Sequence, residues 1–337
     1  MKIVTVGEAK EFLEKTLQDY LPVFLWGPPG IGKSSIVKQI CEEKKWKMVD
    51  IRLSTVNPVD LRGLPVVDRE KGQAIWLRPE FFPDPNSKEE GVIFFDELNT
   101  AAASVQIASY QLILDRQLGS YKLPAGYKII AAGNRETDKA NVTKLPAPLA
   151  NRLIHLELQT DHKQWITWAI KAKIDQRIIN FIQFKPDLLS TTPKGDEKAF
   201  PTPRSWEFVS RIVKLFDDIE DSKALVAGAI GEGAMSEFFA WLPSYASLPD
   251  VMEILAGKSN KVPKRADLLS ALVTGLISNL DDSNLENFLN YTFLLPGEHA
   301  VLAVQQAIEG GWVGKLQKLG KWDEWADKFY DLIPAPL

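Results

Sequence analysis

The sequence predicts an α/β domain with a parallel five-stranded sheet between two layers of helices, followed by a smaller all-α domain. In the first half of the chain, short apolar runs alternate with segments that have helical spacing. Short buried strands separated by helices are typical of a parallel sheet that is covered on both faces. After about Thr160 the strand patterns almost vanish and helical patterns dominate, which indicates a change of domain.

Apolar runs predict the strands of the sheet at residues 23–26, 48–53, 92–95, 128–132 and 154–158. Helices are expected between them at 34–45 and 101–116, because apolar residues recur there every three or four positions. Two further segments, 65–82 and 119–128, have the pattern of β-hairpins. Decoration of the domain edge is one interpretation of these hairpins.

The second half is predicted to hold helices at 165–173, 177–184, 205–216, 224–240, 266–277 and 300–309. Residues 187–203 are rich in Pro, Ser, Thr and Lys, and we expect a mobile loop there. We therefore divide the chain into an α/β core (1–159), a helical lid (160–295) and a C-terminal helical extension (296–337).

Ten tryptophans are many for 337 residues, and three of them, Trp312, Trp322 and Trp325, cluster in the predicted extension. Packing of the extension back onto the lid is the favoured interpretation. A docking surface for a partner is the alternative, since aromatic side chains anchor interfaces.

Composition describes a globular chain with room for a large core: 45% of the residues are apolar and 25% are charged. The net charge of -4 gives no general attraction to nucleic acid or to an anionic membrane. The single cysteine, Cys41, excludes an internal disulfide and is predicted to be a small core residue.

Targeting signals and metal-ligand patterns are weak in this sequence. The apolar stretch before Glu8 is too short for a signal peptide, and no apolar run approaches the roughly 20 residues needed to cross a bilayer. We therefore expect a cytoplasmic protein without membrane insertion. The histidines, His155, His162 and His299, lack metal-ligand spacing, so no structural metal site is expected.

A phosphate-binding loop is predicted after the first strand, because residues 27–34 fit the pattern G-x-x-x-x-G-K-[ST] between a strand and a helix. Glycines let successive backbone N–H groups face one anion, and the helix N-terminus adds partial positive charge. Lys33 can reach the β- and γ-phosphates, and the Ser34 hydroxyl can coordinate Mg²⁺. The predicted nucleotide-binding residues are Gly27, Pro28, Pro29, Gly30, Ile31, Gly32, Lys33, Ser34 and Ser35.

Two carboxylates, Asp96 and Glu97, follow the buried run at 92–95. In an open parallel sheet, ligands bind at the carboxyl ends of the strands. Asp96 is therefore predicted to hold magnesium, and Glu97 to act as the general base that polarises the attacking water. The alternative is a strand that ends in solvated acids.

Asn134 ends another buried strand and, if the strands are neighbours, is expected to lie beside the phosphate loop and the two carboxylates, where it can orient the water or touch the γ-phosphate. The alternative is a turn asparagine. Arg152 stands at a corner before the last strand, where it can reach a neighbouring subunit's phosphate as an arginine finger, and Arg135 is a rival candidate.

Arg204 lies in a predicted helix start, with Thr202 as the N-cap and Pro203 in the first turn. A cation there opposes the helix dipole, and a bound anion would reverse that effect. A solvated surface arginine is the alternative interpretation.

These elements, in this order, resemble AAA+ ATPases, and most closely their MoxR-like branch. The resemblance covers residues 21–158 and resumes at 201–209. It is carried by residues 27–34, 57–63, 95–99, Gln106, Leu112, 115–117, Asn134, 145–149, 152–153 and 203–204. Thr100 and Asn151 depart from the branch, which usually has arginine and aspartate at these positions, and this weakens the transfer of a subfamily or client.

The resemblance implies roles for the matched positions. Lys33 and Ser34 resemble Walker A residues, and Asp96 and Glu97 resemble Walker B residues. Asn134 resembles sensor 1, Arg152 the arginine finger, and Arg204 sensor 2, which acts either on its own subunit's nucleotide or on a neighbour's.

The family implies ATP and Mg²⁺ as cofactors, a hexameric ring, and a protein client that often carries a von Willebrand A domain. In related rings, hairpins such as those at 65–82 and 119–128 face the pore or a partner, which is the alternative to edge decoration. Hydrolysis of ATP coupled to remodelling of a protein partner is thus the favoured hypothesis. A nucleic-acid-linked motor of the same superfamily is the alternative, and a nucleotide-gated scaffold without catalysis is a third. The absence of an N-K-x-D motif argues against GTP.

Overall fold

The computed structural model describes residues 2–70, 72–138, 145–193, 196–245 and 247–329. Contacts divide the chain into two compact units, Met1–Asp161 and His162–Leu337. We describe each unit by itself. The predicted domain limits at 159/160 and 295/296 stay predictions.

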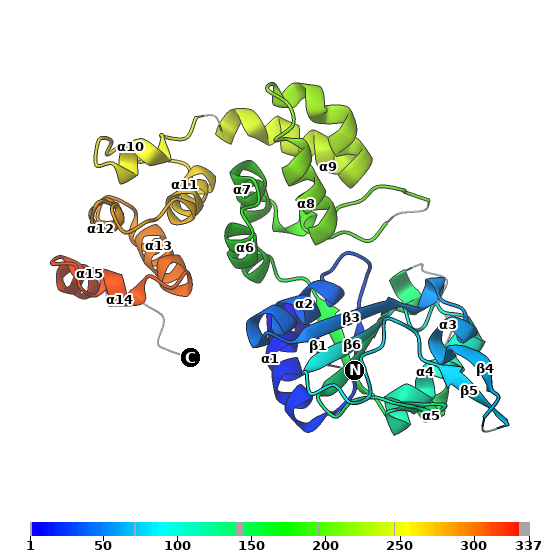
Figure 1. Cartoon of the computed structure of the whole chain (residues 1–337). Helices are drawn as coiled ribbons and strands as arrows, with labels where there is room; N and C mark the ends of the chain where they lie inside the picture. The colour runs from blue at the N-terminus through cyan, green and yellow to red at the C-terminus, as the bar shows by residue number, and fades with distance from the viewer. Residues whose placement is uncertain (1, 71, 139–144, 194–195, 246, 330–337) are drawn as a thin grey trace. The chain divides into compact units, whose positions relative to one another are not determined.

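Unit 1 is built on a six-stranded sheet with the order β1-β10-β2-β9-β6-β3, and every neighbouring pair is parallel (Figure 1). The strands are β1 (Ile3–Thr5), β10 (Ile154–Gln159), β2 (Val23–Trp26), β9 (Tyr127–Gly133), β6 (Gly91–Asp96) and β3 (Lys47–Arg52). The predicted fold class is confirmed. The sixth strand, β1, was not predicted, because three residues are too few to show a pattern.

Helices cover both faces of this sheet, as Figure 1 shows. α1 (Val6–Thr16) and α2 (Lys33–Lys44) pack on one face, against Leu25 of β2 and Phe94 of β6. α3 (Pro58–Arg62), α4 (Ala103–Asp115) and α5 (Ala147–Ala150) pack on the other face, against Phe24 and Phe95. Neighbouring residues of one strand thus enter opposite cores, which explains why the central strands β2 and β6 are apolar along most of their length.

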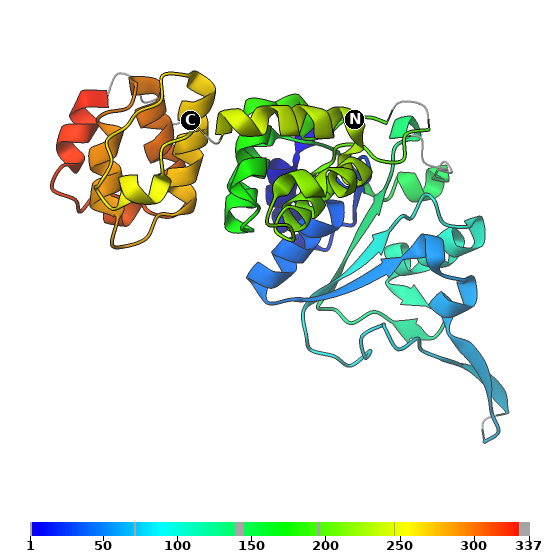
Figure 2. The ribbon, with the colours of Figure 1, turned by 90° about the horizontal axis from the view of Figure 1, so that it is seen from above.

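Both predicted hairpins exist. β4 (Leu64–Asp68) pairs with β5 (Gln73–Leu77) and extends away from the sheet as the blue ribbon in Figure 2. The second hairpin, β7 (Gln117–Leu118) with β8 (Tyr121–Lys122), lies slightly earlier than its predicted span. It closes at Gly119, whose φ of 59° suits a tight turn, so Tyr127 and Lys128 already belong to β9.

Among its described residues, unit 2 contains helices joined by loops and no β-strand. Its helices are α6 (His162–Lys171), α7 (Gln176–Phe184), α8 (Pro203–Ile212), α9 (Lys223–Tyr245), α10 (Val251–Leu255), α11 (Ala266–Ser278), α12 (Leu285–Thr292), α13 (Gly297–Glu309), α14 (Val313–Leu316) and α15 (Trp322–Phe329). The helix predicted over 224–240 is interrupted at Gly231, where φ is 82° and ψ is 156°.

Two hydrophobic cores hold unit 2 together. α6 to α9 bury the first, which is centred on aromatic residues such as Phe181, Trp206 and Phe238. α10 to α15 bury the second, which includes Trp325, while Trp312 and Trp322 pack against it. The C-terminal tryptophans therefore pack against their own unit, as the favoured interpretation expected. Within the described part of the chain, no helix is both long enough and apolar enough to cross a membrane.

Candidate active site

The loop predicted to cradle phosphates lies between β2 and α2. Gly32 caps α2 with a φ of 109°, and Gly30 has a φ of 77°, values that side chains disfavour. The Gly27 N–H donates to the Gly133 carbonyl at 3.3 Å, which ties the loop to the neighbouring strand β9. Ser34 and Ser35 lie in the first turn of α2, where backbone N–H groups lack helical partners. The loop and the helix start together form an anion-binding geometry.

Lys33 begins α2 and is only 9% exposed. Its ammonium donates to the carbonyls of Gly27 at 2.6 Å and Pro28 at 3.1 Å, and to Asn134 Oδ1 at 2.9 Å. The charge is therefore held inside the loop, beside the end of β9. An anion in this cradle would meet a positioned counter-charge.

Asp96 ends β6, opposite Arg52 of β3, and one strand away from Asn134. Burial raises the pKa of the Asp96 carboxyl, and the nearby Lys33 partly opposes that shift. The Asp96 Oδ1 accepts the Glu97 N–H at 2.9 Å. A partly buried, desolvated carboxylate at this edge is suited to a hard cation.

Glu97 turns away from the strand with a φ of 58°, which is uncommon for a residue with a side chain. Its carboxylate accepts a hydrogen bond from the Ser54 hydroxyl and forms an ion pair with Arg52 at 3.9 Å. These two contacts fix the carboxylate next to the end of β3. Asp96 has neither of these partners among the described residues, so the two adjacent acids are suited to different tasks.

Arg52 and Ser54 were not singled out in the sequence. A signal for them existed: the strand predicted at 48–53 ends at the same sheet edge as the one that delivers Glu97. Asn99 is a third residue that was given no role, although it bonds the main chain of Asn134 twice.

Asn134 follows β9 and lies beside the phosphate loop, as predicted, through its bond from Lys33. Arg135, the next residue, is tied within its own unit to Asp138 at 2.7 Å and to Glu157 at 3.0 Å. These carboxylates raise the pKa of Arg135, chiefly through the hydrogen bond to Asp138, and neutralise its charge locally.

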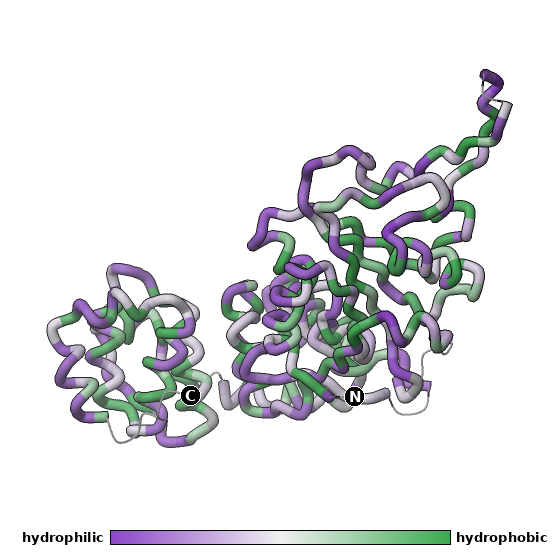
Figure 3. Tube along the Cα trace, turned by 90° about the horizontal axis from the view of Figure 1, so that it is seen from below, coloured by the Kyte–Doolittle hydropathy of each residue, from purple (hydrophilic) through white to green (hydrophobic). Residues whose placement is uncertain are grey.

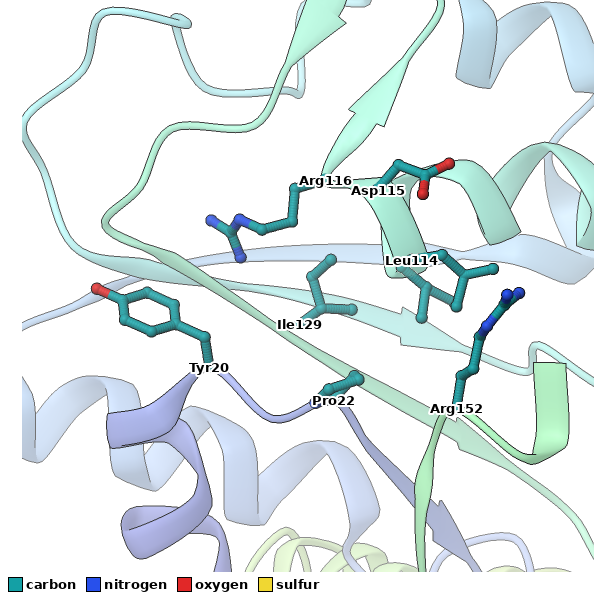
Figure 4. A pocket seen from close by; sticks show the side chains of 8 residues that line it. Tyr20, Pro22, Leu114, Asp115, Arg116, Ile129 and Arg152 are labelled. Carbon is teal, nitrogen blue, oxygen red and sulfur yellow. The ribbon is translucent and has the colours of Figure 1, made fainter. Parts of the chain in front are cut away.

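Arg152 lies at the opposite edge of the sheet, just before β10 begins at Ile154. Its exposed side chain lines a cavity of about 400 Å³ together with Tyr20, Pro22, Ile113, Leu114, Asp115, Arg116 and Ile129 (Figure 4). Pro22 precedes β2, which confirms that this cavity opens at the amino edge of the sheet. Within the described residues, the Arg152 guanidinium has no hydrogen bond or ion pair.

Arg204 belongs to unit 2, as the second helical residue of α8. Thr202 caps this helix as predicted: its hydroxyl accepts the Ser205 N–H at 3.0 Å, and its own N–H donates to the Ser205 hydroxyl at 2.8 Å. The Arg204 side chain is exposed. The carboxyl edge of the sheet in unit 1 thus brings together Lys33, Asp96, Glu97 and Asn134, whereas Arg152 lies at the amino edge of the same sheet.

Together, the parallel sheet, the glycine loop before a helix, and the acids at the next strand end define a nucleotide-binding domain of the P-loop class. Residues 23–158 match the family model described as "ATPase family associated with various cellular activities (AAA)". This segment is therefore similar to the AAA ATPase family domain, and the match supports ATPase activity.

A curated relative, an uncharacterised AAA domain-containing protein of Schizosaccharomyces pombe, is 29% identical over 119 residues. That alignment covers 34% of this chain and only 14% of the relative, so the two proteins share a domain and not a whole architecture.

Solved structures with similar chains include NtrX from Brucella abortus in complex with ADP, which is 12% identical with a TM-score of 0.40. The similarity covers 91% of this chain and 65% of the NtrX chain. A RuvB variant from Thermotoga maritima is 17% identical with a TM-score of 0.34, covering 87% of this chain and 92% of that one. The fold assignment rests on the sheet topology described above and not on these distant neighbours.

Proposed function

We propose that this chain is a magnesium-dependent ATPase that couples hydrolysis to the remodelling or maturation of a protein partner in the cytoplasm. The observation that carries the proposal is the convergence of Lys33, Asp96, Glu97 and Asn134 at the carboxyl edge of one parallel sheet. A phosphate cradle alone supports only binding. An adjacent carboxylate with its own fixed surroundings adds a base for hydrolysis.

The residues fit a magnesium ion, because Ser34 and Asp96 offer the hard oxygen ligands that this cation prefers. The burial that raises the pKa of Asp96 would be offset by a bound divalent cation. When bound, the ion would neutralise charge on the β- and γ-phosphates.

In the proposed reaction, Lys33 holds the β- and γ-phosphates and Glu97 accepts a proton from the attacking water. The side chain of Asn134 orients that water or contacts the γ-phosphate. Arg152 supplies positive charge to the nucleotide of a neighbouring copy, because it lies at the sheet edge opposite its own loop. Arg135 is the weaker finger candidate, since Asp138 and Glu157 already neutralise it.

A finger acting on a neighbour requires an assembly in which each site is completed by the next copy. We therefore propose a closed ring, for which the MoxR-like resemblance implies six copies. Arg204 serves as the second sensor in the same proposal, on its own nucleotide or on a neighbour's.

The projecting β4–β5 hairpin supports a protein partner. Leu64 pairs with Leu77 on one face, and Val67 and Trp76 lie on the other. Leu64 is 61% exposed, Val67 74% and Trp76 42%, and Figure 3 shows hydrophobic positions along the ribbon. An isolated two-stranded ribbon with apolar side chains on both faces favours burial in an assembly. The proposed client is a protein, for which the resemblance favours one with a von Willebrand A domain.

The first prediction concerns the base. In Glu97→Gln, Mg-ATP binding should stay within about threefold of the wild type, whereas turnover should fall by about 10²-fold or more, because the amide cannot accept the water's proton. Fluorescent-nucleotide titration and phosphate release measure the two quantities.

The matched control is Glu89→Gln, which changes an exposed glutamate of the same unit that pairs with Lys47 at 2.7 Å and accepts a hydrogen bond from the Ser87 hydroxyl at 3.4 Å. Its turnover should equal that of the wild type. Normal hydrolysis by Glu97→Gln would remove Glu97 as the base, and absence of turnover in the wild type would favour a nucleotide-gated scaffold.

A further inference from the structure

Asn99 lies two residues after Glu97, and its side chain is almost fully enclosed, at 1% exposure. Both of its amide atoms bond the main chain of a single residue. The Asn134 N–H donates to Asn99 Oδ1 at 3.2 Å, and Asn99 Nδ2 donates to the Asn134 carbonyl at 2.7 Å. A two-point contact of this kind fixes both the position and the orientation of the Asn134 peptide groups.

Gly133 makes this close approach possible. A β-carbon added at Gly133 would lie 2.1 Å from Asn99 Oδ1 and 2.7 Å from the ring of Phe24. Glycine at the end of β9 therefore leaves the space that the Asn99 amide occupies.

The turn that carries Glu97 is attached to the same strand end. The Leu98 N–H donates to the Ala132 carbonyl at 3.0 Å, and the Thr100 N–H and hydroxyl both donate to the Glu97 carbonyl, at 3.1 Å and 2.9 Å. The segment 97–100 and the end of β9 are thus cross-linked by backbone and side-chain hydrogen bonds.

The connection continues into the phosphate loop, because Asn134 Oδ1 accepts a hydrogen bond from Lys33 at 2.9 Å. One path of hydrogen bonds therefore runs from the turn of Glu97, through Asn99 and Asn134, to the ammonium that would meet the phosphates. Asn99 is almost fully enclosed, so its side chain offers no surface to a ligand.

We propose that Asn99 is a positioning residue that sets the main chain of Asn134 and holds it in register with Glu97. This inference rests on the proposed ATPase function. It assigns Asn99 an action through Asn134 and no contact with nucleotide. A buried amide that merely satisfies its own hydrogen bonds would affect stability alone.

Two variants of the full chain separate these roles. Asn99→Leu removes both hydrogen bonds at similar volume, and Asn99→Asp keeps the acceptor for the Asn134 N–H while losing the donor. We expect Asn99→Leu to lower kcat by about 10- to 100-fold, because small displacements of positioning groups have such effects, with the KM for ATP changed less than about threefold.

A double-mutant cycle tests whether Asn99 acts through Asn134. The effect of Asn99→Leu on kcat should be largely lost in an Asn134→Ala background, since the positioned group is then absent. Effects that multiply fully would overturn the proposal. Gln106→Leu is the matched control: it removes another buried amide, which bonds only the Ala101 carbonyl at 3.0 Å, and it should leave kcat unchanged.

Hydrogen exchange of the Asn134 amide provides a readout without catalysis. Exchange should speed up about tenfold or more in Asn99→Leu and stay near the wild-type rate in Asn99→Asp, which keeps the acceptor. Unchanged exchange in Asn99→Leu contradicts the proposal, even if that variant is less stable overall. If the wild type hydrolyses no ATP, the proposed function fails, and the exchange result still decides whether Asn99 fixes Asn134.

Discussion

Cys41 shows how the chemical reactivity of a single residue follows from its burial. Cys41 lies inside the core between α2 and the sheet, as its position in the sequence predicted. Burial raises the pKa of its thiol to about 11, against an ordinary value of 9.0. At pH 8 the thiolate fraction is then about a hundredfold lower than in the unfolded chain.

We therefore predict that Cys41 resists modification by a disulfide reagent at pH 8 in the native protein. Addition of denaturant should accelerate the reaction by at least about a hundredfold, because unfolding restores both access and the lower pKa. Absorbance of the released thiolate measures the rate. Rapid labelling of the native chain would show that the core around α2 is open.

The residues that bear chemistry were predictable where a motif carried them, and not where a contact depended on strand register. Lys33, Asp96 and Asn134 lie at one sheet edge because each follows a strand that the apolar pattern revealed. Ser54 and Asn99 were missed as partners of Glu97 and Asn134, because these contacts depend on which strands are neighbours. Their roles, like those of the predicted site residues, stay predictions.

At the N-terminus of helix α8, Thr202 stabilises the helix and Arg204 opposes its dipole. The Thr202 hydroxyl satisfies a backbone N–H, whereas the cation of Arg204 lies where the helix dipole is positive. Thr202→Ala should lower the free energy of unfolding by about 1 kcal/mol. Arg204→Ala should leave it unchanged or raise it by a few tenths of a kcal/mol in the ligand-free protein.

Urea unfolding of the full chain measures both effects. Thr167→Ala is the control, since this threonine lies inside α6 and its hydroxyl bonds only the Lys163 carbonyl. That change should cost little, because alanine favours a helix interior. Equal losses in Thr202→Ala and Thr167→Ala would argue against the cap, and a large loss in Arg204→Ala would give Arg204 a structural role.

Long elements with a clear period were predicted well, and short ones were not. The principal strands and helices α2, α4, α7 and α11 overlap their predicted spans. β1 has three residues, and the hairpin over 117–122 depends on a tight turn at Gly119. At Gly231 the backbone leaves helical geometry. The apolar periodicity of the surrounding sequence continues past this residue and therefore predicted an unbroken helix.

At the scale of the whole molecule, the two edges of the sheet in unit 1 divide the proposed reaction. The carboxyl edge holds the proposed phosphate loop and the proposed base, and the amino edge holds Arg152 beside its cavity. The two edges lie at opposite ends of the same strands, so residues on both edges of a single copy cannot contact one nucleotide. Assembly is therefore the central claim of the proposed mechanism, and the exposed apolar hairpin gives such an assembly further surface to bury.

The most direct test is ATP turnover per chain, measured against protein concentration for the wild type and for Arg152→Ala, with mass measured in the same samples. Wild-type turnover should rise steeply as copies assemble. Arg152→Ala should bind Mg-ATP and assemble, yet lose turnover by about 10²-fold or more at every concentration, as expected for a missing finger. Constant turnover per chain down to concentrations at which the protein is monomeric, with equal rates in Arg152→Ala, would contradict a site completed by a neighbour.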